Sequence, residues 1–336
     1  MILPCAAVLL LGVGQDRQIE DLRERLRAEK PKEREEALWK LNDLTKKVKW
    51  KVLEPLIPQV VRLLKDPERR VRRAAAVVAA TLGAKDAIPD LRGLLKDPDD
   101  DVREHAAGAL ADLEAKEAIP DLRGLLKDPH HDVRRAAADA LADLSAKETV
   151  PDLLELTKDD VAEVRARAAA ALGDLGAREE APDRLAELLE DEDAYVRRKA
   201  AEALGELGAR EKISALLKRL RDEDGDVRAA AVGALEELLE DEDAEQIAPY
   251  LKDKDSAVRR RAVRLLGPMK SEKATELLAP RLADEASEVR RAAVDAVYER
   301  RDKEDIPRLE ERLKEEKDGK VRDALKRAIE KLKKLK

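Results

Sequence analysis

The chain has 336 residues, of which 43% are apolar, 43% are charged and only 1% are aromatic, and its formal net charge is −7. A globular core of this size normally uses aromatic side chains to fill volume, so the lack of Phe favours helices that pack closely through Ala, Leu, Val and Ile. The acidic balance argues against nucleic acid as the main partner, because phosphate binding requires a basic surface. The single cysteine, Cys5, excludes an intramolecular disulfide.

Residues 1–16 form a segment unlike the rest of the chain. Residues 1–14 carry no charged side chain, yet they are too few to span a bilayer as a helix. The segment is similar to the apolar region of a secretory signal peptide, although the positively charged leader is missing. We expect either an export signal, which places the protein in the periplasm or outside the cell, or a hydrophobic tail on the first repeat of a cytoplasmic protein. We expect no stable membrane insertion, because no other segment is apolar enough.

Residues 17–50 are predicted to be a degenerate repeat that caps the N-terminal end of the fold. Arg34, Ala37, Leu41 and Leu44 have the spacing of the second helix of the repeats that follow, with Trp39 between them. Terminal units of repeat proteins differ from the internal ones because they have a neighbour on one side only.

Residues 51–336 are a repeat region, in which a Val-Arg dipeptide returns nine times at intervals of 31 or 32 residues. A fixed period of this size is typical of solenoids, where each supersecondary unit contacts mainly its neighbours. Two adjacent copies, residues 84–114 and 115–145, agree at 24 of 31 positions. The Val-Arg pairs begin at Val71, Val102, Val133, Val164, Val196, Val227, Val258, Val289 and Val321.

Each unit is predicted to hold two helices, and the first begins near a proline. Proline is tolerated in the first turn because its missing N–H would have no partner there. The first helix is expected to end near an aspartate five residues before the Val, as at Asp97 and Asp128. The prolines are Pro58, Pro89, Pro120, Pro151, Pro182 and Pro307.

The second helix is expected to begin at an acid three residues before the Val and to end at a glycine. Aspartate is a preferred N-cap because its carboxylate accepts hydrogen bonds from unpaired N–H groups, and glycine adopts the left-handed conformation of a C-terminal cap. Counting the Val as position 0, positions 0, 4, 7, 8 and 11 form one apolar stripe, and position 4 is alanine in eight of nine copies. An invariant methyl group indicates close helix–helix approach. The expected caps are Asp99, Asp193, Asp224, Asp255 and Asp318 at the start and Gly83, Gly176 and Gly208 at the end.

Residues 128–141 follow the pattern Asp-Pro-x-x-x-Val-Arg-x-x-Ala-x-x-Ala-Leu. This pattern resembles the HEAT repeat of the short bacterial kind, the phycobilisome-lyase HEAT-like type. The resemblance covers residues 51–336 and implies an all-α fold, a right-handed superhelical solenoid of about ten antiparallel helix pairs. The motif is specific for the fold and unspecific for the function.

The resemblance also implies a structural ladder between the arginines after each Val and the aspartates of the turns between the two helices. A guanidinium group can bind a carboxylate through two hydrogen bonds. The last unit has Glu316 and Lys317 where the aspartate should be, so we expect the ladder to end at Asp284 and the last unit to be a terminal cap. The ladder arginines are Arg72, Arg103, Arg134, Arg165, Arg197, Arg228, Arg259 and Arg290.

No residue matches a catalytic motif, and we expect neither catalysis nor a cofactor. The chain has no cysteine pair and no glycine-rich phosphate loop. His130 and His131 beside Asp128 and Asp132 raise the question of a metal site. Adjacent residues on a turn rarely point at one ion, and the neighbouring repeat has aspartates in place of the histidines, so we favour a solvated turn.

The face of the second helices opposite the apolar stripe is the expected binding surface. Position 2 is arginine in five of nine copies and position 9 is mostly Ala or Gly, so a smooth floor flanked by arginines suits an acidic helix or extended peptide. Alternatively, these arginines pair with nearby acids, as Arg135 does with Asp139 at helical spacing. Tyr195 and Tyr250 are further expected anchors, because interfaces favour Arg and Tyr. The candidate binding residues are Arg73, Arg135, Arg198, Arg260, Arg291 and Tyr298.

These features favour a non-enzymatic scaffold that binds another protein or peptide, of acidic character, through the concave surface of the solenoid. We expect the protein itself to be a monomer. The alternative that the resemblance implies is an accessory or catalytic subunit of a bilin-lyase-like complex. A nucleic-acid-binding solenoid is a third alternative, which the acidic charge disfavours.

Overall fold

The computed structural model of the protein describes residues 17–48 and 50–335. All regular elements of these residues are helices, and none of the helices is both long enough and apolar enough to cross a membrane. The expected export signal or hydrophobic tail falls on residues 1–16, which lie outside the described residues. The chain divides into two compact units, Met1–Leu175 and Gly176–Lys336.

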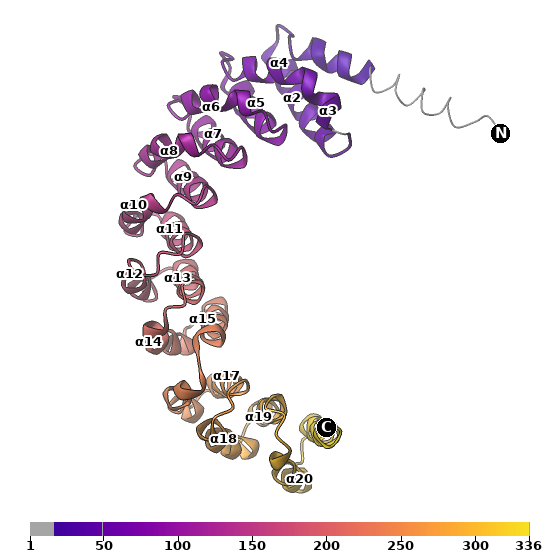
Figure 1. Ribbon diagram of the computed structural model, residues 1–336, viewed down its shortest axis with the longest axis vertical. Coiled ribbons are helices and arrows are strands. Elements are labelled where there is room, and N and C mark those ends of the chain that lie inside the picture. Colours follow the sequence, from indigo (N-terminus) through magenta and orange to yellow (C-terminus); the bar gives the residue numbers. More distant parts are fainter. Residues whose placement is uncertain (1–16, 49, 336) are drawn as a thin grey trace, which may run out of the picture. The chain divides into compact units, whose positions relative to one another are not determined.

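The first unit is a stack of helix pairs in two rows (Figure 1). Each first helix packs against the second helix of its own pair, and each second helix packs against the next second helix. The short helix α3 (Trp50–Leu53) leads into the row of first helices, α4 (Ile57–Leu63), α6 (Ile88–Leu94), α8 (Ile119–Leu125) and α10 (Val150–Leu156). The row of second helices is α2 (Pro31–Thr45), α5 (Arg69–Thr81), α7 (Asp100–Asp112), α9 (His131–Asp143) and α11 (Ala162–Asp174).

The second unit has the same two rows, with less regular first helices. Turns of 3₁₀ helix at Arg219–Arg221, Tyr250–Lys252 and Ala279–Ala283 complete three of them. The first helices are α12 (Pro182–Leu188), α14 (Ile213–Lys218), α16 (Ala244–Ile247), α18 (Glu272–Leu278) and α20 (Ile306–Glu315). The second helices are α13 (Ala194–Glu206), α15 (Gly225–Leu238), α17 (Ser256–Leu266), α19 (Ser287–Glu299) and α21 (Gly319–Lys333).

The predicted helix ends are confirmed. All six prolines lie in the first turn of a first helix, and all five N-cap aspartates accept hydrogen bonds from backbone N–H groups. Gly83, Gly176 and Gly208 adopt φ of 62°, 67° and 67°. The same left-handed position is occupied in three other repeats by a residue with a Cβ, which strains the backbone there. These residues are Glu114, Ser145 and Arg301.

The core lies between the two rows and is built from small and branched aliphatic side chains. Position 4 of the second helices is completely buried, as predicted. First-helix leucines such as Leu91, Leu122 and Leu153 fill the space opposite, also with no exposed area. The buried alanines are Ala75, Ala106, Ala137, Ala168, Ala200, Ala231, Ala262 and Ala293, each 0% exposed.

The first described helix pair closes the N-terminal end of the first unit. Residues 17–25 are helical, and Leu22 and Leu26 are buried. Helix α2 packs on α5 and buries Ala37 and Leu41, so the stripe predicted for this segment faces the core. The domain limit at residue 50 stays a prediction.

Candidate binding surface

In the first unit, the arginine after each Val ties one repeat to the next. Arg72 of α5 donates from Nε and Nη2 to the two carboxylate oxygens of Asp97, at 2.7 and 2.8 Å. Its Nη1 donates to the backbone carbonyls of Asp66 and Pro67, in the turn of its own repeat. Each guanidinium group therefore joins its own turn to the turn of the next repeat, with the bidentate geometry that arginine allows and lysine does not. The same pairing joins Arg34 to Asp66, Arg103 to Asp128 and Arg134 to Asp159.

These ion pairs connect consecutive repeats and have a structural role. Burial alone would raise the pKa of Asp128, but hydrogen bonds from Arg103 and from the backbone N–H of His130 outweigh it and lower the pKa below its usual value. The side chains of Arg103 and Asp128 are only 12% and 6% exposed. Because the polar atoms are buried and paired with each other, a partner protein has little access to them.

In the second unit, the ladder continues but departs from the prediction at its end. Glu316 takes the place of the aspartate and accepts hydrogen bonds from Nε and Nη2 of Arg290, at 2.7 and 2.9 Å. The expectation that the ladder ends at Asp284 is therefore wrong, because the longer glutamate makes the same bidentate contact. Burial alone would raise the pKa of Glu316, but the hydrogen bonds from Arg290, the Asp318 N–H and Arg312 lower it to about 2. The regular pairs are Arg197 with Asp222 and Arg259 with Asp284.

The ladder is interrupted between α15 and α17, which the sequence does not predict. Arg228 of α15 donates to the backbone carbonyls of Asp222 and Glu223 but binds no carboxylate of the described residues. Asp253, which stands where the partner of Arg228 should be, accepts a hydrogen bond from Arg221 instead. The Nε of Arg228 is buried and has no hydrogen-bond partner, so this arginine is not the ladder residue that the resemblance implies.

The ladder arginine Arg165, at the end of the first unit, keeps the contacts with its own turn. Its Nη1 donates to the backbone carbonyls of Asp159 and Asp160, at 2.8 and 3.2 Å. These are the contacts that Nη1 of Arg72 makes, so the local half of the ladder geometry is preserved.

The candidate binding arginines at position 2 are mostly paired with acids, as the alternative interpretation expects. Arg135 contacts Glu104 of the preceding repeat at 2.8 Å and Asp132 and Asp139 of its own helix at 3.5 and 3.7 Å. Such pairs on the surface contribute little stability and separate easily. Three others have one acid each within 4.0 Å, namely Arg73 with Asp101, Arg198 with Glu202 and Arg291 with Asp295.

Arg260 differs from the other four. Its side chain is exposed and makes no hydrogen bond or ion pair within the described residues. It is therefore the position-2 arginine whose charge is most available to a partner.

The small residues at position 9 pack against the next repeat and do not form an exposed floor, contrary to the prediction. A Cβ placed on Gly205 would lie 3.0 Å from the Cα of Ala234 in the next second helix. Ala111 and Ala142 are 9% and 8% exposed. Position 9 is small because the neighbouring helix passes directly over it. Where Glu236 stands at this position, α15 and α17 meet over a shorter stretch than the other second helices of the second unit do.

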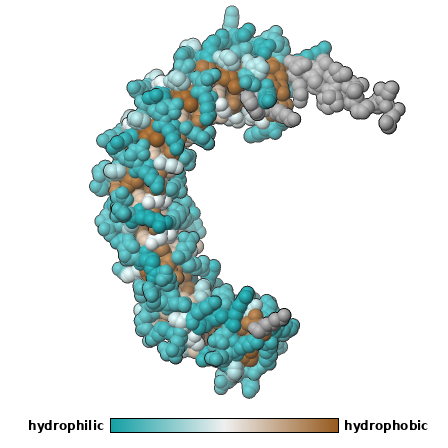
Figure 2. All heavy atoms as spheres, viewed as in Figure 1, coloured by the Kyte–Doolittle hydropathy of each residue, from teal (hydrophilic) through white to brown (hydrophobic). Residues whose placement is uncertain are grey.

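The tyrosines differ in how well they could serve as anchors. Among the described residues, Tyr195 is a large hydrophobic side chain that is exposed, at 43%. The Cζ atom of Arg198 lies 5.0 Å from the centre of its ring. Tyr298 is half-buried, with the ammonium group of Lys331 5.3 Å from its ring centre. Tyr250 is 9% exposed beneath Arg221, so its prediction as an anchor is wrong. Hydrophilic residues cover most of the face seen in Figure 2, with hydrophobic ones between the rows of helices.

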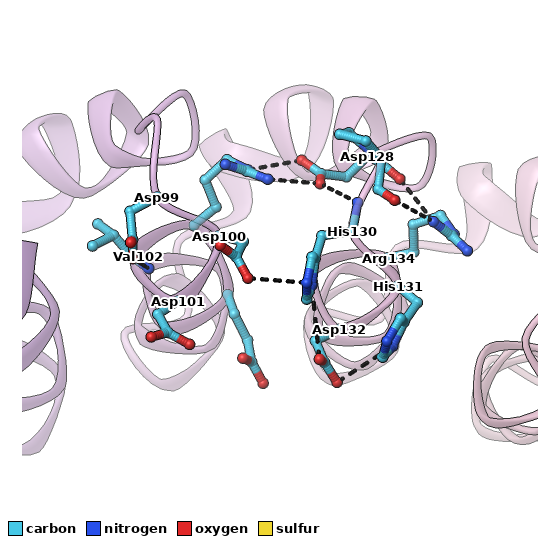
Figure 3. A network of polar contacts seen from close by, with 12 residues as sticks. Asp99, Asp100, Asp101, Val102, Asp128, His130, His131, Asp132 and Arg134 are labelled. Atoms are coloured by element: carbon cyan, nitrogen blue, oxygen red, sulfur yellow. Dashed lines mark hydrogen bonds and ion pairs between the residues drawn. The ribbon is translucent and has the colours of Figure 1, made fainter.

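His130 is the N-cap residue of α9 and His131 is its first residue, and Figure 3 shows both imidazole rings near the carboxylate of Asp132. The ring centres are 5.1 Å apart. His130 Nε2 lies 3.1 Å from Asp100 of the preceding repeat, and its Nδ1 lies 3.7 Å from Asp132. Within the described range, no three side chains of metal-ligand type come together as a metal-binding group.

An open cavity of about 760 Å³ lies in the second unit between α15, α17 and α19. Arg260, a predicted binding residue, lines this cavity. Arg261, Arg264 and Glu299 also line it, and the sequence analysis did not predict them as binding residues. The signal that points to them is Glu236, because it breaks the pattern of small residues at position 9.

The sequence matches the family model for HEAT repeats in six overlapping stretches, residues 19–111, 57–142, 93–173, 122–193, 181–248 and 244–330. The chain belongs to the HEAT-repeat family. Each HEAT repeat is one helix pair of the two-row stack, and the ladder joins consecutive HEAT repeats.

A solved structure supports the same fold. The crystal structure of an engineered protein is similar to this HEAT-repeat chain with a TM-score of 0.53, over 94% of this chain and 99% of the other, at 23% sequence identity. A comparison with the sequences of curated proteins found no match. These matches show a helical HEAT-repeat solenoid, and the phycobilisome-lyase type stays a prediction.

Proposed function

We propose that this HEAT-repeat protein is a non-enzymatic scaffold that binds another protein through the exposed face of its second helices. The observation that carries the proposal is the contrast between two sets of positions on these helices. Position 4 is alanine in eight of nine copies and buried in all of them. Position 6 is buried in none of the nine copies and varies among Val, Gly, Asp, Ala, Glu and Arg. Uniform positions build the stack, so the variable exposed positions are available to specify a partner.

The partner is expected to be a protein with acidic groups. Arg260 is exposed without an ion pair within the described residues, and the pairs of Arg135 are surface pairs that an incoming carboxylate can replace at small cost. Acidic residues are interspersed along the same helices, which disfavours nucleic acid. Nothing in the described residues favours the bilin-lyase alternative.

Affinity purification from the organism that makes this chain, followed by mass spectrometry, tests the proposal. Arg135→Glu on α9 is compared with Arg92→Glu on α6, because the two side chains are 37% and 41% exposed and each pairs with an acid of a neighbouring repeat. We expect a reproducible protein partner that the Arg92 variant retains and the Arg135 variant loses. Recovery of no reproducible partner, or equal loss in both variants, would contradict the proposal. Light scattering of the purified protein tests the expected monomer.

A further inference from the structure

The cavity between α15, α17 and α19 forms where a second helix lacks the small residue that elsewhere lets the next helix approach. A Cβ on Gly267, at position 9 of α17, would lie 3.4 Å from the Cα of Ala296 in α19. Helix α15 carries Glu236 at this position, and its carboxylate reaches Nε of Arg264 on α17 at 2.8 Å. A glutamate is too large for the close contact that glycine allows. Helices α15 and α17 therefore meet over a shorter stretch than α17 and α19 do, and they stand farther apart in Figure 1.

One end of the cavity carries arginines that lack acceptors. Arg260 and Arg261, from the N-terminal half of α17, line the cavity, and Nη1 of Arg261 is buried without a hydrogen-bond partner among the residues that the structure describes. Arg228, whose carboxylate partner is taken by Arg221, lies beside them. Burial, together with the nearby charges of Arg228 and Arg260, lowers the pKa of Arg261 below its usual value. A buried donor without an acceptor is costly, so this end is suited to an incoming carboxylate.

The other end of the cavity is acidic. Asp295 and Glu299 of α19 line it together with Glu236. Glu236 is paired with Arg264, whereas Glu299 makes no ion pair within the described part of the chain. Burial, followed by the charges of Asp295 and Glu236, raises the pKa of Glu299 above its usual value. This end is therefore suited to a cation.

The two ends lie a definite distance apart along the helices. Arg260 and Arg261 stand at positions 2 and 3 of their helix, and Glu236 and Glu299 at positions 9 and 10 of theirs. Seven residues of α-helix correspond to about 10 Å. Gly233, at position 6 of α15, also lines the cavity, and its lack of a side chain leaves the middle open to a chain segment.

We propose that this cavity binds a segment of a partner protein, which presents an acidic side chain to Arg260 and Arg261 and a basic side chain to Glu299. This inference rests on the proposed function and assigns the chemistry of one binding site. The two charges of the segment stand about seven residues apart if it is helical and about three if it is extended. A nucleic acid does not fit, because its phosphates would meet the acidic end.

Selection of phage-displayed random peptides on the full chain tests this inference. We expect enriched peptides to carry one acidic and one basic residue at either spacing. In fluorescence anisotropy of the enriched peptides, Arg261→Ala is expected to weaken binding by about tenfold or more, since the lost hydrogen bonds join charged groups. Arg184→Ala on the first helix α12 is the control and leaves the affinity unchanged, because Arg184 pairs with Glu187 of its own helix away from the cavity.

A charge exchange makes the test independent of any loss of folding. Glu299→Lys is expected to weaken binding of the selected peptides, and replacement of their basic residue by glutamate is expected to restore it. Thermal unfolding of each variant confirms that the chain is folded. Enriched peptides that bind the Arg261→Ala variant as tightly as the wild type overturn the assignment of this cavity while protein binding still stands. A selection that enriches no peptide also overturns the cavity assignment, and the purification of a native partner then decides the proposed function separately.

Discussion

The contact between Gly205 of α13 and Ala234 of α15 permits a quantitative test of second-helix packing. A Cβ added to Gly205 would lie 3.0 Å from both the Cα and the Cβ of Ala234. Carbon atoms attract best at about 3.5–4.0 Å, so Gly205→Ala forces the two helices apart by about half an ångström. Overpacking of this kind costs about 1–3 kcal/mol.

Gly233 of α15 is the matched control, because it also lies inside a second helix and a Cβ there would meet no atom within 4 Å. Replacing glycine by alanine inside a helix stabilises it by about 0.5–1 kcal/mol. This gain is common to both substitutions, so the difference between the variants isolates the packing cost. We expect Gly205→Ala to be less stable than Gly233→Ala by about 1–3 kcal/mol.

Urea unfolding followed by circular dichroism measures this difference, and hydrogen exchange of backbone amides locates it. Amides of α13 and α15 should exchange faster in the Gly205 variant than in the Gly233 variant, because the free energy of local opening falls where packing is lost. Equal stability of the two variants would refute the close approach at position 9 and, with it, the explanation of the cavity.

Three further predictions concern single positions. Glu114→Gly should stabilise the protein by about 1 kcal/mol in urea unfolding, because Glu114 has φ of 57° and glycine adopts this conformation without strain. Gly83→Ala should destabilise the protein by a similar amount. An unchanged stability of both variants would show that the left-handed position carries no strain. Ala168→Leu should cost about 1–3 kcal/mol, since Ala168 is 0% exposed; an unchanged melting temperature would show that the site is not closely packed. Glu316, whose folded pKa is about 2 against a usual 4.5, stabilises the protein above pH 4.5 by up to about 3 kcal/mol. This contribution should be lost as the pH falls from 4.5 to 2, and Glu316→Gln should flatten the pH dependence of urea unfolding in that window; an identical slope in the variant would disprove the pairing with Arg290.

The features that repeat were predictable from the sequence. The 31-residue period gives the helix pairs, because most copies share an aspartate before the Val and an alanine at position 4, and six copies share the proline of the first helix. Helix caps such as Asp99 and Gly83 depend on local backbone chemistry, which needs no knowledge of neighbouring repeats. The ladder was implied by the family resemblance, and Arg72 with Asp97 is one of the pairs found.

The errors arose where a residue depends on the next repeat. A helical projection of one helix separates the apolar stripe from the opposite face, but a second helix also has neighbours on both flanks. Position 9 therefore lies under the next helix at Gly205, although the projection places it on the open face. Asp253 pairs with Arg221, where the repeat pattern would place Arg228. This change of partner depends on the path of an irregular first helix, which the repeat pattern does not predict.

The missing ion pair between Arg228 and Asp253 has a consequence for how the second unit unfolds. In a linear stack, the total stability is the sum of the repeats and of the interfaces between neighbours. An interface without its ion pair, with helices held apart by Glu236, contributes least to that sum. We therefore expect the second unit to unfold as two cooperative blocks, α12 to α15 and α16 to α21, which denaturant or tension on the chain separates first at this junction.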